Sequence, residues 1–233
     1  MTDLSERSTR DELMDGPGVS RADYERCLAD LEKVNRLTLT HRPTLKWLDR
    51  AVKGLPLDTP VTILDVACGH GDLLRTIYLW AHHRGRRVVL QGLDMNPASA
   101  LAARAVTPQQ MPITYRTGDV FADVPEPRPD FIVSSQFTHH LSDAQVLTFL
   151  QWLERYAQRG WYIADLHRHA VPYYGFRILA TLAGWHRIVR YDGTVSIARS
   201  FRHDEWQALL ARAGVQAEIR WHVPFRLCVG RLK

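Results

Sequence analysis

The sequence predicts an α/β fold in which helices cover both faces of a doubly wound, mostly parallel sheet. The first observation is that apolar runs of strand length, at 61–66, 88–93 and 113–117, alternate with stretches of helical periodicity. The second is a turn directly after the first run, where Gly69 and Gly71 allow a sharp bend and a close approach to a ligand. This alternation is typical of parallel sheets with helical crossovers.

The third observation concerns the ends of these strands. Asp65 lies at the end of the first strand, Asp94 ends the second, and Asp119 follows the third. Because the carboxyl ends of parallel strands share one edge, and such sheets bind ligands there, we expect a ligand site at this edge.

We expect the chain to have three parts. Residues 1–20 are polar and predict a mobile N-terminal arm. Residues 21–57 contain two helical patterns, at 21–37 and from 43 to 52, and predict an N-terminal helical lid. Residues 58–233 then form the core.

Local signals place the elements of this core. Asn96 is expected to cap a helix that has Pro97 at its first position. Ser142-Asp-Ala-Gln145 is a capping-box sequence, which predicts a helix to about residue 157. The other expected elements are strands at 61–66, 87–93, 112–117, 130–135 and 161–166 and helices at 72–83 and 97–105.

The last part of the chain combines an insert at about 170–202 with the end of the sheet. The apolar, aromatic stretch 172–186 predicts a helix, and 191–201 predicts a loop with some extended structure. A helix at 204–213 and two strands at 215–223 and 225–232 are expected to follow.

Composition limits the class of protein. The 233 residues are 45% apolar, enough for one large domain. No apolar run reaches the length of a membrane span, and the N-terminus has no signal-peptide core, so we expect a cytoplasmic protein. The three cysteines are far apart and predict neither disulfides nor a zinc site. The net charge of +5 is spread along the chain, which favours a solvated surface over a nucleic-acid interface.

Four segments, in this order along the chain, resemble the class I S-adenosylmethionine (SAM)-dependent methyltransferases. The resemblance covers about residues 60–166. It implies SAM as the cofactor and a Rossmann-like, seven-stranded sheet with a late antiparallel strand. The segments are Leu64-Asp-Val-Ala-Cys-Gly-His-Gly71, Gly92-Leu-Asp-Met-Asn-Pro97, Thr117-Gly-Asp-Val120 and Phe131-Ile-Val-Ser-Ser-Gln-Phe-Thr-His-His-Leu141.

The resemblance assigns cofactor roles to residues at the strand ends. Asp94 would accept hydrogen bonds from the ribose hydroxyls; the alternative is a helix cap, a role that Asn96 already serves. Asp119 and Val120 match the adenine-binding position, and a turn-forming Asp119 is the alternative. NAD-binding proteins also use an acid at the Asp94 position, but the longer Gly-x-Gly-x-x-Gly fingerprint is incomplete here because Leu74 stands at its last position.

Other residues are expected around the methionine part of SAM. Arg42 is the candidate for binding its carboxylate, with a solvated arginine as the alternative. Ser135 ends the fourth strand beneath the sulfonium, where ordinary strand termination is the alternative. The remaining cofactor candidates are Asp65, Ala67, Gly69, Gly71 and Met95.

Histidines dominate the candidate catalytic residues. Methyl transfer to a hydroxyl benefits from a base, since a phenol ionises near pH 10, and histidine titrates near neutrality. His139 and His140 follow the fourth strand, and Asp165-Leu-His167-Arg-His169 follows the fifth. We rank His140 first, His167 second and His139 third. A core or helix-start contact is the alternative for His140. Asp-x-His-x-His can also bind metal, but no third element is evident, so no metal is expected.

Aromatic residues in the insert are candidates for the acceptor pocket. Tyr173, Tyr174 and Phe176 lie where class I methyltransferases keep substrate-recognition inserts, although such a stripe is often core packing. After the fourth strand there is no Asn/Asp-Pro-Pro-Tyr and no cysteine, which weighs against common nucleic-acid methyltransferases.

A narrower resemblance spans almost the whole chain and suggests the acceptor. The chain is similar to bacterial methyltransferases that accompany type III polyketide synthases, which implies O-methylation of a phenolic or enolic small molecule. The alternatives are a C-methyltransferase on a quinone-like ring, a nucleic-acid methyltransferase and a non-catalytic SAM-binding protein. The oligomeric state is left open. The matching segments are Leu31-Glu-Lys-Val-Asn-Arg-Leu37, Asp165-Leu-His-Arg-His169, Tyr173-Tyr-Gly-Phe-Arg177, Ser196-Ile-Ala-Arg-Ser-Phe201 and Phe225-Arg-Leu-Cys-Val-Gly-Arg231.

Overall fold

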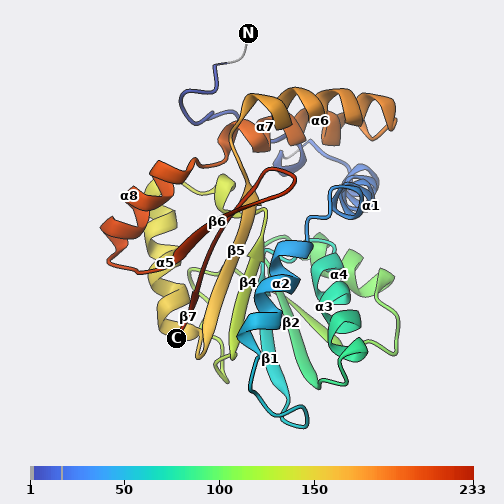
Figure 1. The fold of residues 1–233 in the computed structure, drawn as a ribbon. Coiled ribbons are helices and arrows are strands. Elements are labelled where there is room, and N and C mark those ends of the chain that lie inside the picture. Colours follow the sequence, from blue (N-terminus) through green and yellow to red (C-terminus); the bar gives the residue numbers. More distant parts are fainter. Residues whose placement is uncertain (1–2, 17) are drawn as a thin grey trace.

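A seven-stranded sheet forms the centre of the computed structural model, which describes residues 3–16 and 18–233 (Figure 1). Its strand order is β3-β2-β1-β4-β5-β7-β6, and β7 runs antiparallel to both of its neighbours. The predicted Rossmann-like sheet with a late antiparallel strand is therefore confirmed. The strands are β1 (Val61–Val66), β2 (Val88–Asp94), β3 (Ile113–Thr117), β4 (Phe131–Ser135), β5 (Gly160–Leu166), β6 (Glu218–His222) and β7 (Arg226–Leu232).

Alternate residues of the central strands enter two hydrophobic cores, one on each face of the sheet. In β4, Phe131 and Val133 face one core and Ile132 the other; in β5, Tyr162 and Trp161 divide in the same way. This follows from the two-residue period of a strand, and both faces are apolar because helices cover both.

Helices α2 (Arg42–Ala51), α3 (Asp72–His83) and α4 (Pro97–Val106) contribute to the first core, and α5 (Asp143–Tyr156) and α8 (His203–Ala213) to the second. The capping residues that the sequence predicted are found at the beginning of α4 and of α5. Asn96 accepts a hydrogen bond from the Ala98 N–H, and Ser142 and Gln145 form the capping box of α5.

The insert consists of two paired helices, α6 (Ala170–Leu182) and α7 (Arg187–Arg199), beyond the carboxyl end of β5 (Figure 1). The expectation of a loop with extended structure at 191–201 was wrong. β-branched residues and Gly193 have low helix propensity, but packing prevails over propensity here. Val195 is buried, and Gly193 leaves room for the ring of Phe176, which a side chain at this position would strike.

Helix α1 (Arg21–Leu37) and the N-terminal arm lie at the same end of the molecule as α6 and α7 (Figure 1). The described part of the arm carries a short 3₁₀ helix, η1 (Leu13–Asp15), and is bound to the core at several points. The Ser8 N–H donates to the Ala198 carbonyl, the Leu13 N–H donates to Asp192, and Arg7 lies over the Phe201 ring. The sequence pattern predicted a mobile arm and did not indicate which of its residues make these contacts.

None of the helices in the described part of the chain combines the length and apolar composition needed to cross a membrane.

We predict that Ile77→Ala lowers the free energy of unfolding by about 2 to 5 kcal/mol. Ile77 is fully buried on the inner face of α3, so truncation leaves a cavity. Leu79→Ala is the matched control on the same helix: Leu79 is 47% exposed and the change should stay within about 0.5 kcal/mol. Urea unfolding measures both, and equal effects would contradict the packing described for α3.

Candidate active site

The turn between β1 and α3 brings backbone to the carboxyl edge of the sheet. Ala67 and Gly71 adopt left-handed conformations, with φ of +58° and +72°. For alanine this conformation costs about 1 to 3 kcal/mol, and such strain gathers at functional sites. A side chain at Gly71 would strike the Tyr115 ring. The predicted cofactor residues Ala67, Gly69 and Gly71 therefore form a tight loop, in which the side-chain position of Gly69 is open.

Asp94 lies beside this loop. Its carboxylate accepts hydrogen bonds from the N–H groups of Gly69 (2.8 Å) and Asn96 (2.9 Å). The carboxylate is partly exposed at the end of β2. It is thus fixed in direction by backbone groups and can accept hydrogen bonds from a ligand.

Asp65 is almost completely buried at the end of β1. Its Oδ1 has no hydrogen-bond partner among the described residues. Burial, followed by the negative charges of Asp72 and Asp94, raises the pKa of Asp65 well above its usual range. A carboxyl group in this environment is stabilised as an anion only when a cationic or hydrogen-bond-donating group arrives.

The lid supplies partners to the next carboxylate, Asp72, at the first turn of α3. Its Oδ2 accepts hydrogen bonds from the Asn35 amide (2.9 Å) and pairs with His41 Nε2 (2.8 Å). Burial acts to raise the pKa of Asp72, but His41 and Asn35 outweigh it and lower the pKa to about 2. Arg42 is exposed at the start of α2, next to His41.

A chain of hydrogen bonds continues from the lid to the sheet. Gln136 donates from Nε2 to the Asn35 side chain (2.8 Å) and has a left-handed backbone. Arg226 is buried and donates to the hydroxyls of Thr38 (3.1 Å) and Thr40 (2.5 Å). Burial lowers the pKa of Arg226 to about 10. These contacts hold the end of α1 against β4 and β7.

The other cofactor candidates occupy the same edge. Asp119 is exposed after β3 and accepts a hydrogen bond from the Phe121 N–H, whereas Val120 is buried. Met95 is 75% exposed beside Asp94. Ser135 ends β4, and its buried Oγ has no partner among the described residues.

His139 is buried and locked in place. Its Nδ1 lies 2.7 Å from Asp165 Oδ1, and its backbone N–H and the Thr138 hydroxyl both bind Asp165 Oδ2. Burial acts to lower the pKa of His139, but the negative charges of Asp165 and Glu12 raise it to about 9. At neutral pH this imidazole is therefore protonated and does not act as a base in this state.

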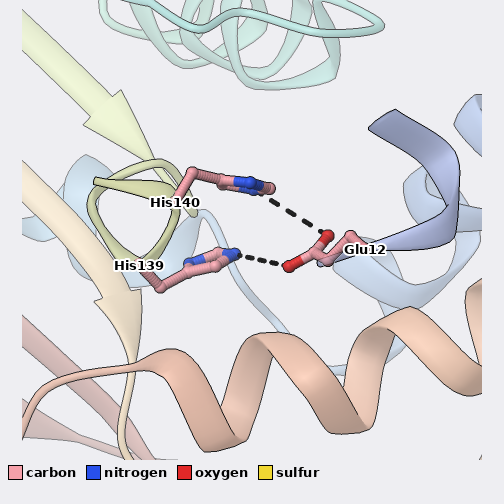
Figure 2. Close-up of side chains that lie close together, drawn as sticks. All are labelled: Glu12, His139 and His140. Carbon is pink, nitrogen blue, oxygen red and sulfur yellow. Dashed lines mark ion pairs between the residues drawn. The ribbon is translucent and has the colours of Figure 1, made fainter. Parts of the chain in front are cut away.

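Glu12 of the N-terminal arm reaches the same place (Figure 2). Its Oε1 lies 3.5 Å from His139 Nε2, and its Oε2 lies 3.9 Å from His140 Nε2. The His140 side chain is 29% exposed. Arg199 donates to the carbonyl groups of both histidines, which fixes the loop after β4. Of the two histidines, His140 is the one that an acceptor can approach.

His167 lies in a different hollow. A pocket of about 550 Å³ is lined by His167, His169 and the start of α8, and neither His139 nor His140 lines it. His167 Nδ1 has no partner among the described residues. Burial, and then the nearby cationic groups, lower the pKa of His167, so it is neutral at neutral pH. The structure thus separates the two predicted histidine clusters.

The aromatic candidates divide between packing and exposure. Tyr173 is buried against Ile197 and Ala198 of α7, and Phe176 stacks on Trp185. These two positions match the core-packing alternative. Tyr174 is 39% exposed and is the one of the three that offers substantial surface to a ligand.

Residues 63–160 match the family model of a methyltransferase domain. The chain contains a methyltransferase domain. The match covers the glycine-containing turn, Asp94, Asp119 and the loop of His139 and His140, and with the fold it confirms the expected methyltransferase enzyme. The comparison with curated proteins found no matching sequence.

Solved structures of similar fold support the architecture. Human N-acetylserotonin methyltransferase in complex with SAM has a TM-score of 0.63 at 15% identity; the alignment covers 92% of this chain but 56% of that enzyme. Magnesium protoporphyrin IX methyltransferase from Synechocystis PCC 6803 with bound SAH (S-adenosylhomocysteine) gives 0.58 at 15% identity, covering 94% and 91%. The plantazolicin methyltransferase BpumL in complex with SAH gives 0.63 at 14%, covering 90% and 95%.

We predict that Asp94→Asn weakens SAM binding by about 1 to 3 kcal/mol, the range for hydrogen bonds to a charged group. The carboxylate at this edge is positioned by Gly69 and Asn96, and an amide offers one acceptor fewer. Calorimetry measures the affinity, with Asp58→Asn as a control because Asp58 is exposed in the loop before β1. Unchanged affinity in a folded Asp94→Asn protein would remove Asp94 from the site.

We predict that Asp65→Asn stabilises the ligand-free methyltransferase at neutral pH while weakening SAM binding. The pKa of Asp65 is raised in the folded state, so the wild type loses stability relative to the amide as pH rises above about 4, where unfolded aspartate ionises. Thermal unfolding at pH 4 and pH 7 should show the variant's advantage only at pH 7. If the variant were more stable than the wild type by the same amount at pH 4 and pH 7, the raised pKa of Asp65 would be contradicted.

Proposed function

We propose that this methyltransferase transfers the methyl group of SAM to a hydroxyl of a small phenolic or enolic acceptor. The observation that carries the proposal is the buried Asp65, whose Oδ1 has no partner among the described residues, beside the tight glycine turn and the directed carboxylate of Asp94. When bound, SAM supplies an activated methyl group on a cationic sulfur.

The residues fit this cofactor group by group. The buried Asp65 would accept the ammonium of the methionine part, which neutralises a charge that otherwise costs stability. Asp94 would bind the ribose hydroxyls, and Asp119 with Val120 the adenine. The open side-chain position of Gly69 would admit the chain between them. Ser135, whose hydroxyl has no partner within residues 3–16 and 18–233, is available to the methionine end of the ligand.

His140 is the best candidate to take or orient the acceptor's proton. Both ring nitrogens of His139 face carboxylates, and His167 lines a pocket that neither His139 nor His140 lines. His140 is accessible and follows β4 directly, next to the proposed position of the sulfonium. Tyr174 and the arm beside the short 3₁₀ helix η2 (Thr138–His140) would border the acceptor. The narrower resemblance to enzymes of type III polyketide pathways suggests a phenolic lipid or pyrone as the acceptor.

We predict that His140→Ala slows methyl transfer about 10²- to 10⁴-fold at pH 7 with SAM affinity nearly unchanged. The loss should shrink toward pH 10, where a phenol ionises without help. The measurement is turnover with SAM on a panel of phenols, quinols and pyrones, with products analysed for O- and C-methylation.

His167→Ala serves as the comparison and should cost much less, since His167 lines a pocket that does not include His140. Near-wild-type turnover of His140→Ala at neutral pH would exclude His140 from proton handling. Methylation at ring carbon alone would replace the proposed reaction with C-methylation.

A further inference from the structure

Glu12, His139 and His140 converge on one point, although Glu12 lies far from the two histidines in the sequence (Figure 2). The potential ligand atoms of these three residues all lie within 4.8 Å of one another. Two of the residues, Glu12 and His139, are buried, so this is not a chance group of exposed acids.

The spacing of these atoms is too long for strong hydrogen bonds. His139 Nε2 and His140 Nε2 lie 3.5 and 3.9 Å from the Glu12 oxygens, whereas charge-assisted N–H···O bonds measure about 2.7 to 2.9 Å. Ligands at about 2.0 to 2.2 Å from a tetrahedral zinc ion stand roughly 3.3 to 3.5 Å apart. Small side-chain movements would therefore place all three around one ion.

The surrounding hydrogen bonds orient two of the three ligands. His139 Nδ1 lies 2.7 Å from Asp165 and keeps its N–H toward that carboxylate. An incoming ion would displace the second proton, on Nε2, and the Nε2 lone pair would then point toward Glu12. Ser196 donates from Oγ to Glu12 Oε1 at 2.8 Å. Metal-binding histidines and carboxylates are commonly held by such outer partners, which fix the tautomer and the direction of the ligand.

The backbone of the arm is fixed directly after Glu12. The N–H groups of Leu13 and Met14 donate to the Asp192 carboxylate at 2.7 and 2.9 Å. The carboxylate of Glu12 is thus presented by an anchored segment, and the site needs little reorganisation to accept an ion.

We propose that Glu12, His139 and His140 form a binding site for a divalent transition-metal ion of the zinc class. Two histidines and one glutamate are a ligand set of catalytic zinc sites, which keep a fourth position open. The His140 side chain is 29% exposed, so the group is not closed off from solvent. Ion binding does not depend on the proposed function. If both hold, His140 acts as a ligand, and the ion rather than the imidazole would favour ionisation of the acceptor hydroxyl.

The test is a titration of the full-length, metal-stripped protein with Co²⁺, followed by displacement with Zn²⁺, without SAM or acceptor. We expect one ion per chain, visible absorption of cobalt in a low-coordinate site, and higher thermal stability with the ion bound. Glu12→Gln and His140→Ala should each weaken binding at least about tenfold, and Asp165→Asn about 10- to 100-fold.

His83→Ala is the matched control, because His82 and His83 form another consecutive histidine pair, exposed at the end of α3. It should leave Co²⁺ affinity unchanged. Circular dichroism of each variant separates loss of binding from loss of fold. Absence of stoichiometric binding to the wild type, or equal weakening by Glu12→Gln and His83→Ala, would overturn the metal site and leave the methyltransferase proposal untouched.

Discussion

Four carboxyl groups lie at the carboxyl edge of the sheet, and their need for partners determines which segments of the chain meet there. Asp65, Asp72, Asp94 and Asp165 all lie at this edge, and an unpaired buried carboxylate is costly. Three of the four have partners within the protein: the lid serves Asp72, the glycine turn serves Asp94, and the loop after β4 serves Asp165. Asp65 has an oxygen left without a partner among the described residues, and this is where a cationic ligand is most favourable.

This arrangement explains why the N-terminal segments belong to the site. Asn35 and His41 come from the lid, and Glu12 comes from the arm. These residues contact carboxylates or imidazoles of the core. The lid and the arm therefore contribute both to the stability of this edge and to the pKa values of Asp72 and His139. The charges of Asp72 and Asp94 both raise the pKa of Asp65. A cationic group that binds at Asp65 would therefore also interact with these two neighbouring carboxylates.

The parts that sequence patterns predicted well are those that depend on local periodicity or local capping. The strands, the helix caps at Asn96 and Ser142 and the positions of Asp65 and Asp94 are of this kind. Helix α7 was missed because packing against α6 outweighs the low helix propensity of its residues. Contacts between distant segments leave no local signal, which is why Glu12 and Arg226 were not foreseen. Asn35 and Arg226 lie in segments that the narrower resemblance included, but their contacts with Asp72 and with the Thr38 and Thr40 hydroxyls were not apparent from it.

The most direct test of the central claim is calorimetric titration of the wild-type protein with SAH and, separately, with NAD at neutral pH. The glycine turn lacks the last glycine of the dinucleotide fingerprint, and the proposed role of the buried Asp65 is to bind an ammonium group rather than a pyrophosphate. SAH should therefore bind at one site per chain, and NAD should show no binding. Binding of NAD without binding of SAH would contradict the assignment of this edge as a methyl-donor site.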